Sequence, residues 1–186
     1  MLYQIALFMH VVGAQMLSAA LGVDWLCVAG LRKARTIEMA KNSMSTFEKL
    51  IPTVFIALFL ILVTGIYLTV TAWRWSDWII ATFVAIVLIA VFGAMAGRKI
   101  KAMTEMARHE SKITPALLRL LTDGSLLLSL RIRTALFLGI VYLMTARPEM
   151  KGSLITLVVC LVVGLLPLTP KARQEVADYP ERAGER

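Results

Sequence analysis

The chain begins with an apolar stretch long enough to cross a lipid bilayer. Residues 4–30 are mostly apolar, and about 20 such residues span the hydrocarbon core at the rise of an α-helix. The stretch ends at a basic cluster that contains Arg32, Lys33 and Arg35. A long apolar run that stops at basic residues is typical of a transmembrane helix. Because it lacks a preceding basic segment and a small-residue cleavage site, we expect this helix to be retained rather than removed as a signal peptide.

The composition favours a membrane protein over a soluble domain. Of the 186 residues, 59% are hydrophobic and only 17% are charged, which leaves too little polar surface for a soluble domain of this length. The formal net charge is +8. In a membrane protein this excess is typical of the positive-inside bias, so nucleic acid is not an expected partner.

Five apolar segments follow one another, which predicts an all-α, polytopic transmembrane helix bundle with five spans. The expected spans cover residues 4–30, 50–72, 78–97, 125–146 and 153–168. Ser45 and Glu48 have the spacing of a capping box, which predicts that the second helix begins near Ser45. Residues 1–170 would form the bundle, and residues 171–186 would form a charged cytoplasmic tail.

The basic residues predict the orientation in the membrane. In the five-span arrangement, all but three of the 20 lysines and arginines lie on one side. The three exceptions are Arg74, Arg147 and Lys151. Basic loops stay in the cytoplasm, so the N-terminus is expected outside and the C-terminus inside the bacterial inner membrane. The same residues favour contact with anionic lipid at the cytoplasmic face.

Two polar residues in the first span are candidates for a site. His10 and Asp24 are fourteen residues apart, slightly less than four turns, so they share one face of a helix. Along the axis they are about 21 Å apart. This distance excludes a histidine–aspartate catalytic pair or a shared metal ion, and it predicts two separate sites near the two membrane surfaces.

Each of these residues has a functional and a structural interpretation. His10 would bind haem iron or a metal ion, relay protons, or hydrogen-bond to a neighbouring helix. Asp24 would mark the inner end of an ion path or form a structural ion pair. Arg131 and Arg133 lie at a similar depth in the fourth span, so one of them is the expected partner of Asp24.

Small residues predict where helices approach closely. Gly13 and Ala14 lie between His10 and Asp24, so that stripe is expected to face the bundle. Gly93 and Gly97 form a GxxxG motif in the third span. This motif favours close helix contact and, more weakly, a homodimer or a membrane-protein partner.

The first two spans resemble a group of small bacterial membrane proteins. The resemblance lies in two segments joined by a basic loop, LFMHVVGAQMLSAALGVDWL and PTVFIALFLILVTGIYL. The group includes the copper-resistance D proteins, the J-type membrane protoporphyrinogen oxidase and a related integral membrane family of unknown function. The matching positions are His10, Gly13, Ala14, Thr64 and Gly65, and the likeness covers about the first seventy residues.

The resemblance implies a helical membrane protein and, in its oxidase branch, haem b held by His10. That oxidase pairs its histidine with a lysine in a later helix, and no lysine lies within an expected span here. The group also carries a tryptophan and small residues at mid-helix, where this chain has residues 15–18, QMLS. The uncharacterised branch is therefore the nearest comparison.

Three functions remain open from the sequence. The first is a non-enzymatic accessory or transporter-like membrane protein, and no catalytic residue or cofactor is predicted for it. The second is a b-type haem oxidoreductase that uses His10. The third is a metal or ion transporter that uses His10 and Asp24. Cys27 and Cys160 lie in separate apolar segments and predict neither a zinc site nor a disulfide framework.

Overall fold

The computed structural model describes residues 1–108, 110 and 112–166, and this part of the chain is all-helical, as the sequence predicts. The described residues form six α-helices and one π-helical turn, with no β-strand among them. The elements are α1 (Leu2–Lys33), α2 (Ile37–Leu68), η1 (Thr69–Trp73), α3 (Asp77–Ala107), α4 (Pro115–Thr122), α5 (Ser125–Ala146) and α6 (Met150–Leu165). The expected tail, residues 171–186, lies outside the described residues.

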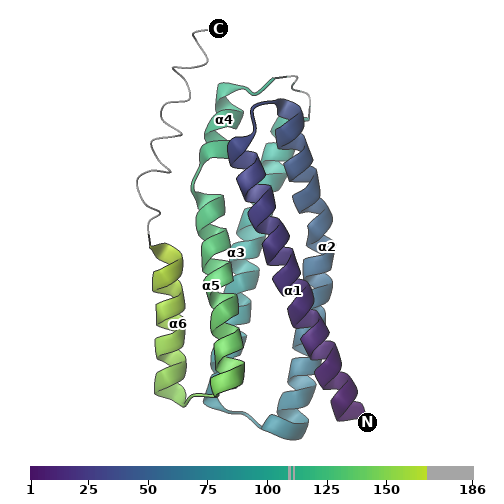
Figure 1. Ribbon diagram of the computed structural model, residues 1–186, viewed down its shortest axis with the longest axis vertical. Helices are drawn as coiled ribbons and strands as arrows, with labels where there is room; N and C mark the ends of the chain where they lie inside the picture. Colours follow the sequence, from purple (N-terminus) through teal and green to yellow (C-terminus); the bar gives the residue numbers. More distant parts are fainter. Residues whose placement is uncertain (109, 111, 167–186) are drawn as a thin grey trace.

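Four long helices pack side by side into one bundle (Figure 1). Helix α1 lies along α2, and α3 lies along α5. Contacts of α2 with α3 and of α1 with α5 join the two pairs. The shorter α6 packs outside the bundle, against α5 and α3. We call the end where α1 ends and α5 begins the basic end, and the end that holds η1 the aromatic end.

The second helix begins earlier than the capping-box spacing predicts, so the predicted start near Ser45 is wrong. Thr36 is the actual N-cap, and its side chain accepts a hydrogen bond from the backbone N–H of Met39 at 3.3 Å. The first turns of α2 bury apolar side chains at helical spacing against the rest of the bundle. These buried residues are Ile37, Ala40, Met44 and Phe47. Their burial stabilises a helix in a segment whose outward face is polar.

Helix α6 is shorter than the membrane-length helices of the bundle. It begins at Met150, where the backbone N–H donates to Asp77 Oδ2 at 3.0 Å, and it ends at Leu165. Its 16 residues cover about 24 Å at helical rise, less than the roughly 30 Å of a bilayer core. Four helical segments are long and apolar enough to cross a membrane: Leu2–Lys33, Ile37–Trp73, Asp77–Ala107 and Pro115–Ala146.

Much of the outer surface of the bundle is apolar, unlike the surface of a soluble protein. Large apolar side chains point outward, among them Phe55 and Phe59 on α2 and Val158 on α6, each more than half exposed. Two charged side chains, those of Asp24 and Arg133, are buried inside the bundle. This distribution suits a lipid environment, in which apolar surface is solvated by acyl chains.

Of the two small-residue patterns in the sequence, the one at Gly13 lies at a close helix contact, whereas the GxxxG motif does not. A Cβ atom on Gly13 would lie 3.0 Å from Ile61 Cγ1 and 3.1 Å from the carbonyl oxygen of Ala57, so α1 and α2 nearly touch there. Ala14, beside it, is half-buried. In the GxxxG motif, a Cβ atom on Gly93 would lie 3.8 Å from Cδ of Arg133, whereas the Cβ position of Gly97 has no heavy atom within 4 Å.

Candidate functional site

The buried face of α1 carries both residues that the sequence singled out. His10, Gly13, Leu17 and Asp24 are all buried on this face. Glycine and leucine lie between the two polar residues, and this allows α2 to pack closely along α1. The structure therefore keeps His10 and Asp24 apart, each in its own environment at one end of the bundle.

Asp24 is paired with Arg133 of α5. Nη1 of Arg133 donates a hydrogen bond to Oδ2 of Asp24 at 2.8 Å. Asp24 is 3% exposed and Arg133 is 5% exposed, so both charges depend on each other for compensation. The sequence predicted Arg131 or Arg133 as the partner of Asp24, and in the structure the partner is Arg133. The guanidinium of Arg131 instead donates from Nη2 to the carbonyl oxygen of Val163 near the end of α6, at 3.4 Å.

The surroundings of Arg133 are shaped to accept its long side chain. A Cβ atom on Gly93 of α3 would lie 3.8 Å from Cδ and 3.9 Å from Nη1 of Arg133, at ordinary van der Waals contact. The Ser129 hydroxyl donates to the carbonyl oxygen of Phe92 at 2.8 Å, which holds α3 close to α5 one turn earlier. Nε of Arg133 is buried and has no hydrogen-bond partner within the described part of the chain.

His10 is held at the aromatic end by two consecutive residues of α2. Its Nδ1 lies 3.1 Å from the hydroxyl oxygen of Thr64, and that hydroxyl donates its only hydrogen to the carbonyl oxygen of Leu60 at 2.5 Å. The threonine oxygen must then accept, so the geometry assigns the imidazole hydrogen to Nδ1. A Cβ atom on Gly65 would lie 3.2 Å from Cε1 of His10, so the absent side chain makes room for the ring.

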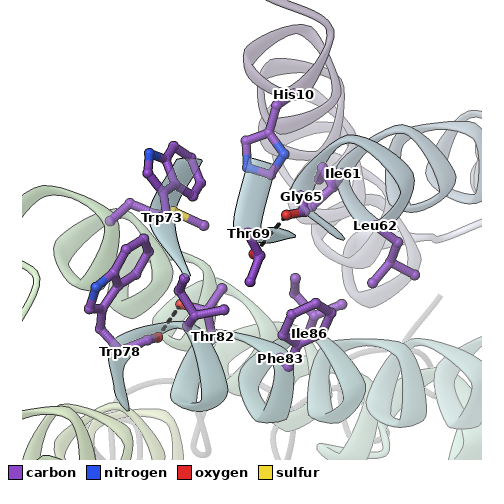
Figure 2. Close-up of a pocket in the computed structure, with 12 residues that line it drawn as sticks. His10, Ile61, Leu62, Gly65, Thr69, Trp73, Trp78, Thr82, Phe83 and Ile86 are labelled. Atoms are coloured by element: carbon purple, nitrogen blue, oxygen red, sulfur yellow. Dashed lines mark hydrogen bonds between the residues drawn. The ribbon is translucent and has the colours of Figure 1, made fainter. Parts of the chain in front are cut away.

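A small cavity lies beside the His10 ring, between α2 and α3 (Figure 2). Its polar lining includes Thr69 and Thr82, whose hydroxyls donate to the carbonyl oxygens of Gly65 and Trp78. The cavity volume is about 20 Å³, room for about one water molecule.

This volume bears on the haem that the family resemblance implies. One imidazole and a cavity the size of a water molecule do not fit a porphyrin in this packing. Haem binding at His10 stays a prediction. It would require α1, α2 and α3 to move apart and open a larger cavity beside the histidine.

Tryptophans and an arginine close the aromatic end above His10. The Trp73 ring meets the His10 ring edge-on, with centroids 6.4 Å apart and an interplanar angle of 82°. The Arg147 guanidinium lies 5.9 Å from the Trp73 ring centroid and 5.7 Å from that of Trp78. Sequence analysis missed these neighbours of His10. The only signal was the cluster of tryptophans in the turn after the second span.

Apolar side chains separate the two buried polar sites. Leu17, Ala57, Ile61 and Ile86 form a buried cluster between the level of His10 and that of Asp24. Within the described part of the chain, these apolar side chains interrupt a polar path along α1 from His10 to Asp24. Among the described residues, no group of three or more histidine, cysteine, aspartate or glutamate side chains is placed to hold a metal ion.

Fold and site together define a class: an all-helical bundle with membrane-length apolar helices and a buried ion pair between two of them. No known protein family, curated protein or solved structure matches this chain.

Proposed function

We propose that the protein is an integral membrane protein of the bacterial cytoplasmic membrane with a non-enzymatic, accessory role. The observation that carries this proposal is the apolar outer surface of the bundle, with exposed phenylalanine and valine side chains around a core that holds the Asp24–Arg133 pair. In water, such a chain would expose a large apolar surface and bury two charges, each at a considerable cost in free energy.

The proposed topology has five spans, an external N-terminus and a cytoplasmic C-terminus. Four membrane-length helices and the shorter α6 support this arrangement. The basic end would then face the cytoplasm, where its lysines and arginines meet anionic lipid headgroups. The three tryptophans of residues 73–78 would lie at the external interface, which suits their amphipathic rings.

The accessory role rests on how the buried polar groups are used. His10 hydrogen-bonds across to α2, Asp24 pairs across to α5, and Ser129 hydrogen-bonds across to α3. Each of these contacts joins two helices of the same bundle. We infer that the polar groups fix one arrangement of helices, which presents an apolar outer surface to a second copy or to another membrane protein.

Extraction and mass measurements test this proposal. The protein should remain in the membrane pellet after alkaline carbonate washing and leave it only in detergent. In a mild detergent, the protein taken from its native membrane should migrate as an assembly larger than one chain. Release by carbonate would contradict membrane integration, and a uniformly monomeric protein would contradict the accessory role.

The haem alternative has a direct spectroscopic test. The size of the cavity beside His10 predicts a purified protein without a Soret absorption band. A Soret band that disappears in His10→Ala would overturn the accessory proposal in favour of a haem protein.

A further inference from the structure

A second cavity lies at the basic end, between the first turns of α2 and the last turns of α3. It is open, and its volume is about 280 Å³, enough for a small organic molecule rather than a single water. Its lining is Lys41, Met44, Ser45, Glu48, Thr104 and Arg108. Five of these six side chains are polar or charged, in contrast to the mostly apolar cavity beside His10.

The charges in this cavity lie at different distances from the basic end. Helix α2 begins at that end, so Lys41 lies nearer to it and Glu48 lies two turns further along, about 10 Å along the axis. Helix α3 ends there, so Arg108 lies nearer to the basic end and Thr104 lies one turn before it. The Lys41 ammonium donates one hydrogen bond to the carbonyl oxygen of Glu110 at 3.0 Å, which fixes its position. An ammonium group has three N–H donors, so two can still bind a ligand. Arg108 pairs with Glu105 at an exposed position, so Lys41 is the less compensated cation.

The Thr104 hydroxyl is the second sign of a ligand. Nine threonines within the helices donate to the carbonyl oxygen four residues earlier. They are Thr46, Thr64, Thr69, Thr71, Thr82, Thr122, Thr134, Thr145 and Thr156. Among the described residues, Thr53 and Thr104 are helical threonines without such a bond, and of the two only Thr104 has a buried hydroxyl oxygen. Thr104 lines the cavity, and its hydroxyl has no hydrogen-bond partner among the described residues. A buried hydroxyl without a partner costs free energy, which a bound ligand would restore.

We propose that this cavity binds a small zwitterion, with a phosphate or carboxylate group between Lys41 and Arg108 and an ammonium group toward Glu48. A simple anion would leave the Glu48 carboxylate facing a like charge, whereas an ammonium group would satisfy it. Lys41 and Glu48 lie about 10 Å apart along the helix axis, and both line the cavity, so their spacing suits a short aminoalkyl phosphate. Phosphoethanolamine has this chemistry, either as a free solute or as a lipid headgroup.

Calorimetric titration of the full chain in a maltoside detergent with O-phosphoethanolamine tests the site. We expect saturable binding, weakened about tenfold in both Lys41→Gln and Glu48→Gln, since each change removes one charge-assisted contact. Thr104→Val, which keeps the shape and removes the hydroxyl, should weaken binding less. The matched control is Lys49→Gln, which removes an exposed positive charge next to Glu48 outside the cavity lining. Thermal unfolding of each variant checks that it is folded.

Inorganic phosphate separates a zwitterion site from a general anion site. Glu48→Gln should bind inorganic phosphate more tightly than the unmodified protein, while it binds O-phosphoethanolamine less tightly. Absence of O-phosphoethanolamine binding would overturn the proposal, as would tighter binding of it by Glu48→Gln or an equal loss in Lys49→Gln. If Lys41→Gln fails to fold, Thr104→Val and Glu48→Gln still decide the result.

Competition with short-chain lipids distinguishes the two sources of the ligand. Displacement by short-chain phosphatidylethanolamine, but not by phosphatidylglycerol, would support the site with a lipid headgroup as its ligand. Displacement by neither lipid, with O-phosphoethanolamine still bound, would support it with a soluble zwitterion. Equal displacement by both lipids would overturn the role given to Glu48, because phosphatidylglycerol lacks the ammonium group.

Discussion

Trp25 of α1 donates its indole N–H to the hydroxyl of Thr134 on α5, over 3.1 Å. Trp25 directly follows Asp24 in the sequence, and Thr134 directly follows Arg133, so the two contacts lie side by side. The Thr134 hydroxyl donates its own hydrogen to the carbonyl oxygen of Leu130, so it is free to accept from the indole. Two consecutive residues of α1 thus bond two consecutive residues of α5, one contact buried and the other partly exposed. Together they fix the rotation of α1 against α5.

The buried ion pair predicts a coupled loss of stability. Asp24→Asn and Arg133→Gln should each lower the unfolding temperature in detergent, because each leaves an uncompensated buried charge or a mismatched partner. Breaking a buried pair costs about 3–5 kcal/mol. The double variant should lose less than the sum of the two single losses, since the second change removes the orphan charge created by the first.

Arg131 is the matched control for this pair. It carries the same side chain two residues earlier on α5, but it contacts the end of α6 instead of Asp24. Arg131→Gln should therefore combine additively with Asp24→Asn. Additive losses for Arg133→Gln as well would contradict a structural ion pair and leave Asp24 available for a functional role.

The fit between His10 and Gly65 predicts overpacking when the glycine is filled. In Gly65→Ala the new methyl group would lie 3.2 Å from Cε1 of His10, inside normal contact distance. We expect a loss of about 1–3 kcal/mol in stability, measured by thermal unfolding. His10→Ala combined with Gly65→Ala should recover most of this loss, because the ring is no longer present.

Gly22 provides the comparison for that substitution. It lies in α1, and no heavy atom approaches within 4 Å of its Cβ position. Gly22→Ala should be neutral or stabilising by about 0.5–1 kcal/mol, the usual advantage of alanine over glycine in a helix. A loss at Gly22 equal to that at Gly65 would mean that contact with His10 is not the cause.

The contact between α5 and α6 is tight at Gly164. A Cβ atom there would lie 2.8 Å from Cα of Ile132, a backbone atom that cannot yield as a flexible side chain would. Gly164→Ala should therefore loosen α6, and limited proteolysis should cleave the variant between α5 and α6 faster than the unmodified protein. Gly97→Ala, on α3 at an open position, should leave the cleavage rate unchanged.

Reporter fusions measure the proposed topology. Fusions after Arg35 and Arg108 should give a cytoplasmic signal, and fusions after Ser76 and Pro148 should give an external one. The fusion after Arg173 decides the role of α6, because a cytoplasmic signal requires α6 to cross the membrane. An external signal there would leave four spans, with α6 inserted only part of the way.

The long apolar helices could be predicted from the sequence because segment length and hydropathy alone define them. The fourth predicted span, residues 125–146, has the bounds of α5. The start of α2 was harder to predict, because polar residues such as Lys41 hide the helical spacing of Ile37, Ala40 and Met44. That spacing was present in the sequence, and together with Thr36 as a cap it was sufficient to place the start.

The arginine partner of Asp24 could not be predicted because two arginines were at the right depth. Arg131 and Arg133 are two residues apart, so they point about 200° away from each other around α5. In a soluble protein, the apolar face of the helix would indicate which one points inward. Here the lipid-facing side chains, such as Leu138, are as apolar as the buried ones, such as Leu136, so hydrophobicity carries little information about rotation.

The π-helical turn at the end of α2 changes the phase of the chain. A π-turn spans one residue more than an α-turn, so the side chains toward the end of η1 are rotated relative to those of an uninterrupted α-helix. Trp73, the last residue of η1, acquires through this rotation its direction toward His10 and Arg147. Deletion of one residue between 69 and 72 would restore the α-helical phase and turn the indole away, which would leave the His10 cavity uncovered on that side.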